Sequence, residues 1–174
     1  MSLPSKIKPK PKSERFVDLT IERCHQDNGL AAALRRADNP DTEYQSWEYL
    51  ANFADLDQTA QRLPYAIIAA AIARAKVTQN GTTRLGRAIA QCYDDDSQSD
   101  QAKAKLRRLL ACDRVEEVCR ILRPLFSLID AKAGVRLDYA RLLNDLLFFN
   151  FDPQRTKSQW AMEFYRRAEK EEMT

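Results

Sequence analysis

Apolar side chains recur every three or four positions along residues 103–129, KAKLRRLLACDRVEEVCRILRPLFSLI. This spacing places them on one face of an α-helix and leaves the opposite face to water. The stretch therefore predicts two amphipathic helices that bury one side each. The residues of the apolar face are Leu106, Leu109, Leu110, Val115, Val118, Cys119, Leu122, Leu125, Phe126 and Ile129.

A helix boundary is expected at Asp113. The run from Asp113 to Glu116 has the form of a capping box, in which the Asp113 carboxylate accepts from the Glu116 amide and the Glu116 side chain returns to the cap amide. Cys112 would then end one helix and Arg114 would begin the next. Pro124 is expected inside the second helix, where it removes a hydrogen bond and bends the helix.

The polar face of this stretch is strongly basic. Solvated helix faces usually interleave both signs of charge, whereas only Asp113, Glu116 and Glu117 oppose the cations here. The segregation indicates a surface for a polyanion, although a solvated face and ion pairs with Glu116 or Glu117 stay open as explanations. The cations are Lys103, Lys105, Arg107, Arg108, Arg114, Arg120 and Arg123.

The rest of the chain is also expected to be helical. Only 4 of its 174 residues are Gly, and Ala, Leu and Arg dominate, which favours helix over sheet. The sequence predicts an all-α protein, a two-lobed helical bundle of about eight helices with short loops. We expect a disordered Lys/Pro tail over 1–12, an N-terminal helical lobe over 13–93, an acidic loop over 94–100 and a C-terminal helical lobe over 101–174.

Three local patterns in the predicted N-terminal lobe are informative. Residues 65–75, YAIIAAAIARA, are apolar nearly all round and predict a central buried helix, with Pro64 at its start. A further helix is expected from Thr42 to about residue 54, with an acidic outer face. Gly86, in the middle of the helical run that follows, is expected to let a neighbouring backbone approach closely.

Charges of opposite sign are separated along the chain. Residues 38–57 contain acids and no Lys or Arg, whereas 103–123 and the tail are basic. Such a bipolar molecule suggests two different surfaces, one for a polyanion and one for another kind of partner. The lysines of the tail are expected to add weak, salt-sensitive contacts or simply to aid solubility.

The residue types exclude several kinds of site. His25 is the single histidine and the four cysteines show no CxxC spacing, so neither a zinc site nor another metal site is expected. Cys112 and Cys119 are expected as core thiols, and Asp94–Asp96 as a solvated loop. No catalytic motif such as GxSxG, a P-loop or HExxH occurs, so we expect a binding protein without catalytic residues or cofactors.

The expected location is the cytoplasm. No apolar run reaches the roughly 20 residues that span a bilayer, so no membrane association is expected. The start, MSLPSKIKPKPK, lacks the apolar segment of a signal peptide. Free, scattered thiols suit a reducing compartment.

Several motifs occur in an order that resembles a known family. They are LRRAD after an NG turn, RLGRAIA after a second NG turn, LRRLLACDRVEEVCRILRPLFSLI, LDYARLLNDLLFF and WAMEFY. The ordered set spans residues 16–165 and resembles the CasB family, the small subunit of the type I-E CRISPR surveillance complex Cascade. The LGRA piece, the Asp113–Arg114 junction and Leu122–Arg123 are most similar to the family pattern.

The resemblance implies a non-enzymatic, all-helical subunit present as two head-to-tail copies that contact the backbone subunits and the large subunit of the complex. It also implies a basic, sequence-independent surface that holds the crRNA–target duplex and the displaced DNA strand, and so stabilises the R-loop in antiviral defence. The matching cations are Arg35, Arg36, Arg84, Arg87, Arg107, Arg108, Arg114 and Arg123. Lys105 and Arg120 of the basic stretch complete the predicted nucleic-acid-binding set.

Two other functions stay open. The chain could be a helical adaptor that binds only protein through its acidic 38–57 face. It could also be a helix-turn-helix DNA reader built from residues 103–123, which would bind one duplex sequence tightly. Trp47 and Trp160 are expected as core anchors, and no exposed aromatic residue for base stacking is expected.

Overall fold

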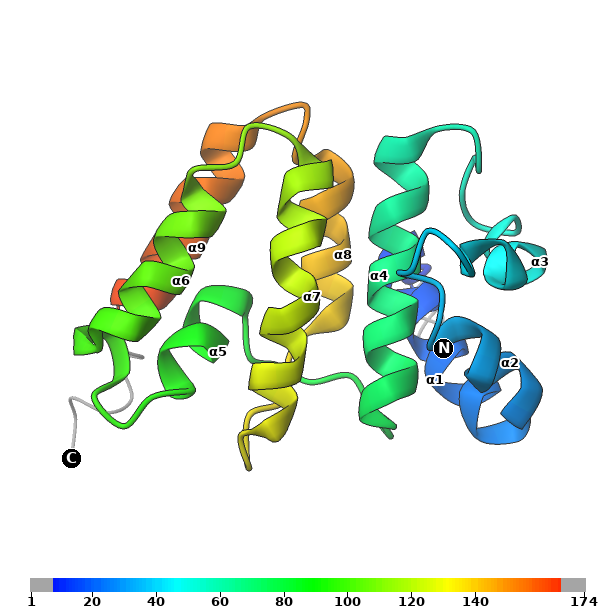
Figure 1. Cartoon of the computed structure of the whole chain (residues 1–174), viewed down its shortest axis with the longest axis horizontal. Helices are drawn as coiled ribbons and strands as arrows, with labels where there is room; N and C mark the ends of the chain where they lie inside the picture. Colours follow the sequence, from blue (N-terminus) through cyan, green and yellow to red (C-terminus); the bar gives the residue numbers. More distant parts are fainter. Residues whose placement is uncertain (1–7, 167–174) are drawn as a thin grey trace, which may run out of the picture.

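The computed structural model describes residues 8–166 and shows an all-α protein, as predicted (Figure 1). This part of the chain contains nine α-helices rather than about eight, together with the 3₁₀ turns η1 (Glu43–Ser46) and η2 (Asp96–Gln98). The helices are α1 (Lys12–Gln26), α2 (Asn28–Leu34), α3 (Trp47–Leu50), α4 (Thr59–Ala75), α5 (Leu85–Gln91), α6 (Asp100–Leu110), α7 (Val115–Ala131), α8 (Tyr139–Phe148) and α9 (Pro153–Tyr165).

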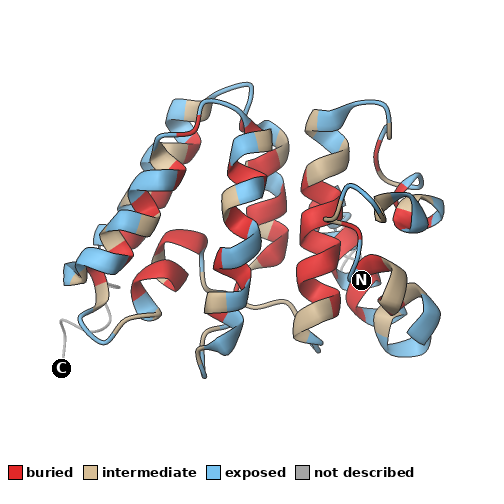
Figure 2. Cartoon of the chain, viewed as in Figure 1, coloured by how far each residue is buried: buried red, intermediate tan, exposed pale blue. Residues whose placement is uncertain are grey.

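Helix α4 is the buried helix predicted from residues 65–75. Every residue from Pro64 to Ala73 is buried, and the helix is red over most of its length in Figure 2. It packs against α1, α2, α7 and α8. Because many of its side chains are Ala, neighbouring helices can approach it closely from several directions.

The remaining helices gather at the other end of the molecule. Helix α5 packs mainly against α9 and also against α6, and these three lie opposite α2 and α3 in Figure 1. Helices α7 and α8 stand between this group and α4. The division into lobes at residues 94–100 stays a prediction.

A short backbone ladder joins the linker before α5 to the linker before α8. The Thr83 N–H donates to the Arg136 carbonyl over 2.9 Å, and the Asp138 N–H donates to the Thr83 carbonyl over 2.8 Å. Gly81 donates to the Leu137 carbonyl over 3.2 Å. A Cβ added to Gly81 would lie 2.0 Å from the Arg136 oxygen, so only glycine fits there.

The predicted position of Pro64 at the start of a helix is wrong. Helix α4 already begins at Thr59, and Pro64 lies inside it. Pro64 is the sixth residue of α4, so its ring removes the backbone hydrogen bond that an N–H there would donate to the Ala60 carbonyl. The helix therefore extends upstream of the apolar run that predicted it.

The predicted capping box at Asp113 is also wrong. Helix α7 begins at Val115 with Arg114 as its N-cap residue, and no side chain of that residue caps it. Instead the Asp113 N–H donates to the Glu117 carboxylate over 3.0 Å, and the Val115 N–H donates to Asn150 Oδ1 over 2.9 Å. Pro124 lies inside α7, as predicted.

Two other expected segments differ in extent. The helix expected from Thr42 to about residue 54 is only the turn η1 and the single turn α3, and Trp47 there is half-buried. Of the predicted tail, residues 1–7 lie outside the described residues. Lys10 forms an exposed ion pair with Asp18 over 3.0 Å, and α1 already begins at Lys12.

Gly86 provides the close backbone approach that the sequence predicted. A Cβ at this position would lie 2.2 Å from the Trp160 carbonyl oxygen and 2.8 Å from the Phe164 nitrogen. The Gly86 N–H also donates to the Glu163 carboxylate over 3.2 Å. The missing side chain therefore fixes how closely α5 packs on α9.

Replacing Gly86 with Ala is expected to destabilise the protein by about 1–3 kcal/mol, because the methyl group forces α5 away from a rigid backbone. Urea-induced unfolding followed by circular dichroism measures the loss. Gln91→Ala on the exposed side of the same helix is the control and should stay within about 0.5 kcal/mol of the wild type. A Gly86→Ala variant as stable as this control would contradict the packing described.

Candidate nucleic-acid interface

The structure places the ten predicted cations in three regions. Arg35 and Arg36 follow α2, Arg84 and Arg87 belong to α5 and its N-cap, and the others lie on α6, on α7 and at the turn between them. Arg87 and Lys105 are partly buried, and the other eight are largely exposed. They do not form one uniform patch, and their surroundings differ.

The first region is organised by the carboxylate of Asp38. This side chain is only 5% exposed, yet it forms ion pairs with Arg74 and with Arg123, the latter at 3.5 Å. Arg35 Nε donates to the Ala73 carbonyl over 3.4 Å at the same end of α4. Arg74 and Arg123 thus share one acid, and Arg35 lies at the same end of α4, which leaves an excess of positive charge. We call Arg35, Arg74, Arg123 and Asp38 the Asp38 cluster.

Arg74 was missing from the predicted set. It follows the apolar run of α4, so the sequence pattern assigned it to the end of a buried helix rather than to a surface. The pairing of Asp38 was missed as well, because an acid 36 residues from its partner gives no local signal. One oxygen of this carboxylate, Oδ1, has no hydrogen-bond partner within residues 8–166.

Arg120 extends the Asp38 cluster along α7. It lies three residues before Arg123, so both project from the exposed side of this helix. The outward sides of α6 and α7 are exposed in Figure 2. Among the described residues, Arg120 forms no ion pair, although Glu116 four residues earlier interacts with it electrostatically. Its exposed side chain remains accessible to a ligand.

Helix α6 contributes a second set of available cations. Arg107 and Arg108 are exposed and Lys105 is half-buried, and none of the three forms an ion pair in the described part of the chain. At the turn that follows, Arg114 pairs with Glu116 over 3.4 Å but remains largely exposed. A phosphate could displace a pair of this kind at little cost, since exposed ion pairs contribute roughly 0–1 kcal/mol.

The two arginines of α5 are the most engaged. Arg87 is partly buried and pairs with Asp96, which ties the predicted acidic loop to α5. Arg84 lies 4.0 Å from Glu163. Within residues 8–166 no group of His, Cys, Asp or Glu could hold a metal ion.

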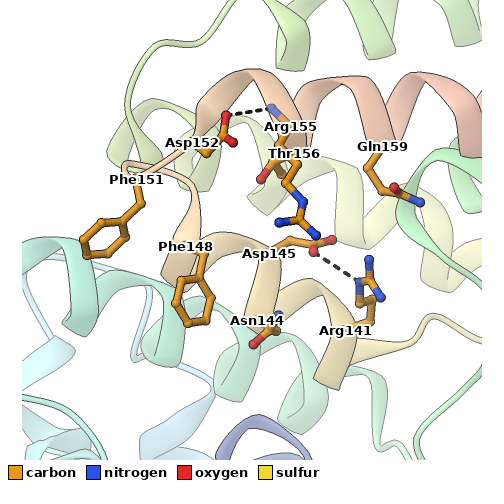
Figure 3. Close-up of a pocket in the computed structure, with 9 residues that line it drawn as sticks. All are labelled: Arg141, Asn144, Asp145, Phe148, Phe151, Asp152, Arg155, Thr156 and Gln159. Carbon is orange, nitrogen blue, oxygen red and sulfur yellow. Dashed lines mark hydrogen bonds and ion pairs between the residues drawn. The ribbon is translucent and has the colours of Figure 1, made fainter.

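Arg84 belongs to a groove along α8 that the sequence analysis did not identify. It lines a hollow of about 480 Å³ with Lys10, Arg141 and Asn144. A second hollow, of about 420 Å³, shares Arg141 and Asn144 with the first. Figure 3 shows this second hollow between α8 and the start of α9. We call the two hollows together the α8 groove.

Exposed aromatic rings border the α8 groove, so the expectation of no exposed aromatic residue is wrong. Phe148 is 58% exposed and Phe151 is 84% exposed. Of the three phenylalanines between residues 148 and 151, only Phe149 is buried. The helix ends at Phe148, and the following turn directs its neighbours outward.

Two buried acids lie behind the groove. Asp145 accepts from Arg141 Nε over 3.2 Å and from the Trp160 indole over 3.3 Å. Burial raises the pKa of the Asp145 carboxyl, although Arg141 opposes this effect. Burial likewise raises the pKa of Glu163, where the hydrogen bond from the Gly86 amide opposes it. Trp160 itself is fully buried, as predicted.

The cysteines have no sign of reactivity. All four are free thiols, and Cys112 and Cys119 are buried, as predicted. Burial raises the pKa of Cys119 to about 12, so this thiol stays protonated at neutral pH. No helix in residues 8–166 is both long and apolar enough to cross a membrane.

Comparison with known proteins identifies relatives of this chain. Residues 30–165 match the family model of CRISPR-associated protein Cse2. A search of curated proteins found no significant match.

Solved structures with similar folds include CasB from M. ruber, with 25% identity over 94% of this chain and 97% of that chain and a TM-score of 0.74. A Cse2-family protein from Thermus thermophilus has 24% identity over 88% and 97% of the two chains, with a TM-score of 0.69. A chain of a CRISPR RNA-guided surveillance complex has 20% identity over 89% and 90%, with a TM-score of 0.70.

Removal of the Asp38 carboxylate is expected to destabilise the protein. Asp38→Ala leaves Arg74 and Arg123 without their shared counter-ion, and the loss should be about 1–2 kcal/mol because both arginines stay partly hydrated. Urea-induced unfolding measures it. Asp18→Ala, which removes the exposed pair with Lys10, should change stability by no more than about 0.5 kcal/mol. Equal effects of the two variants would argue against the organising role of Asp38.

The buried acids predict a pH dependence of stability. Their raised pKa values mean that the folded chain takes up protons more readily than the unfolded chain, so folding gains stability as the pH falls from 7. The gain levels off below the ordinary values of 3.8 and 4.5. Urea-induced unfolding at several pH values should show that the free energy of unfolding of the wild type increases relative to that of the Asp145→Asn/Glu163→Gln variant as the pH falls. A constant difference between the two proteins would refute the raised pKa values.

Proposed function

The chain belongs to the CRISPR-associated protein Cse2 family, and from this we propose that it is a non-catalytic subunit of a CRISPR surveillance complex. It binds nucleic acid through a basic, sequence-independent surface formed by the Asp38 cluster, Arg36, Arg120 and the cations of α6 and its following turn. By this contact it stabilises the crRNA–target duplex and the displaced DNA strand, and hence the R-loop, in antiviral defence.

The excess of arginine over acid on α6 and α7 is the observation that supports this proposal. Lys105, Arg107, Arg108 and Arg120 form no ion pair in the described chain, and Arg114 and Arg123 are paired but exposed. Arg and Lys are the side chains that contact phosphates. A surface of this kind reads the backbone of a nucleic acid rather than its bases.

Modest phosphate contacts are sufficient for such a role. Strand exchange in an R-loop is nearly balanced, because the RNA–DNA duplex that forms is about as stable as the DNA duplex it replaces. A subunit that neutralises a few phosphates can therefore shift the balance toward the open state. The effect should depend steeply on salt, because each contact releases counterions.

The partners follow from the same proposal. They are the crRNA and both DNA strands, the backbone and large subunits of the complex, and a second copy of the chain. One solved structure with this fold is a chain of a CRISPR RNA-guided surveillance complex, which supports an assembled setting. The four free thiols suit action in the cytoplasm.

The adaptor alternative receives less support from the structure. Of the acids between residues 38 and 57, Asp38 pairs with Arg74 and Arg123, and Glu43 pairs with Arg62 over 3.6 Å. These acids are engaged inside the chain, so the acidic face available to a protein partner is smaller than the sequence suggests.

The test replaces Lys105, Arg107, Arg108 and Arg120 with Ala in a reconstituted complex. Because these side chains form no ion pair in the described chain, the change should weaken R-loop retention without unfolding the subunit. We expect a shorter R-loop lifetime and a salt slope reduced by about 0.7–0.9 for each phosphate that the variant no longer neutralises. Dissociation of labelled target DNA at several salt concentrations measures both.

Arg15→Ala is the matched control, since Arg15 is an exposed cation of α1 outside the proposed surface. It should leave lifetime and salt slope unchanged. An R-loop lifetime and salt slope that the fourfold variant shares with wild type would exclude this surface as the nucleic-acid contact.

A further inference from the structure

Two exposed phenylalanines form an unusual surface feature beside the α8 groove. The ring centroids of Phe148 and Phe151 lie 6.2 Å apart with an angle of 49° between the rings. Both residues expose more than half of their surface, although such side chains are normally buried. In Figure 3 the two rings lie next to each other at one edge of the hollow.

The rest of the hollow is polar, and its lining includes two arginines, Arg141 and Arg155, and two acids, Asp145 and Asp152. Figure 3 shows the guanidinium groups of Arg141 and Arg155 directed toward the middle, with Asn144 and Gln159 beside them. The volume of about 420 Å³ falls within the roughly 300–1,000 Å³ of ligand-sized pockets. An apolar protein segment would meet only two apolar side chains here.

The acids of the hollow are already engaged. Asp145 accepts from Arg141 and from the Trp160 indole, and Asp152 caps α9 by accepting from the Arg155 amide over 3.1 Å. Within residues 8–166 neither carboxylate forms an ion pair with the Arg155 guanidinium. An anion can therefore approach Arg155 without displacing an existing ion pair.

The cations continue beyond this hollow. Arg141 and Asn144 also line the neighbouring hollow, which adds Arg84 and Lys10. That hollow is also lined by the acids Glu14, Asp18 and Asp138, and Lys10 there pairs with Asp18, so its charge is mixed. An anionic ligand is therefore favoured in the hollow beside the Phe pair, where Arg155 forms no ion pair within residues 8–166.

We propose that the α8 groove binds an unpaired nucleic-acid strand, with bases stacked on Phe148 and Phe151 and the neighbouring phosphates held by Arg155 and Arg141. Stacking on exposed rings requires a free base face, which a paired base inside a duplex does not offer. The inference rests on the proposed function and deepens it, because it assigns the displaced strand to α8 and α9. The surface on α6 and α7 then serves a different part of the R-loop.

The test uses the full chain and three fluorescently labelled probes of one length: oligothymidine, the same backbone without bases, and a duplex. Phe148→Ala/Phe151→Ala should weaken oligothymidine binding about fivefold or more, and leave binding of the abasic strand and the duplex unchanged. Arg155→Ala should weaken binding of both single strands. Fluorescence anisotropy gives each affinity.

Two controls separate stacking from general effects. Tyr44→Ala removes a ring that is 62% exposed in the N-terminal half and should change no affinity. Phe148→Tyr/Phe151→Tyr keeps two stacking rings and should bind oligothymidine as the wild type does.

Other results would overturn the inference. Equal weakening for the base-bearing and the abasic strand, or no weakening at all, would rule out stacking. If the Phe variant binds strands normally but fails to join the assembled complex, the rings dock a protein subunit instead. The fourfold Lys105, Arg107, Arg108 and Arg120 variant keeps the two proposals apart. If only that variant weakens strand binding, the proposed function is retained and the α8 groove is rejected as a binding site. If the wild-type chain binds no strand, both proposals are rejected.

Discussion

The burial of α4 on nearly every side is the constraint on which the rest of the structure depends. A helix with no solvated face needs neighbours all round, and α1, α2, α7 and α8 supply them. Because α7 buries its apolar side against α4, its polar side remains exposed, and that side carries Arg120 and Arg123. The end of α4 places Arg74 beside Asp38. Core packing thus decides where the basic surface forms.

The periodicity of apolar residues predicted the helices well and their ends less well. The burial of residues 65–75 and the close approach at Gly86 follow from local pattern, because one reflects an apolar run and the other a missing side chain. The start of α7 does not follow from local pattern, because the Val115 amide donates to Asn150 from the turn after α8. No local motif encodes a cap that arrives from 35 residues away.

The same distinction applies to the candidate sites. The sequence identified the cations of α6 and α7 because they cluster within one short stretch, but it could not sort free from paired ones. Arg87 and Arg123 both looked available, and their acidic partners became evident only in the fold. The α8 groove was missed because its members come from α8, α9 and the linker before α5. The exposure of Phe148 and Phe151 depends on where α8 ends, which the apolar pattern alone does not locate.

The backbone ladder between Gly81–Thr83 and Arg136–Asp138 has a mechanical consequence. It clamps the covalent link between α4 and α5 onto the link between α7 and α8. It thereby fixes the start of α5 relative to the start of α8. Because Arg84 follows Thr83 directly, the same hydrogen bonds also position this arginine at the α8 groove.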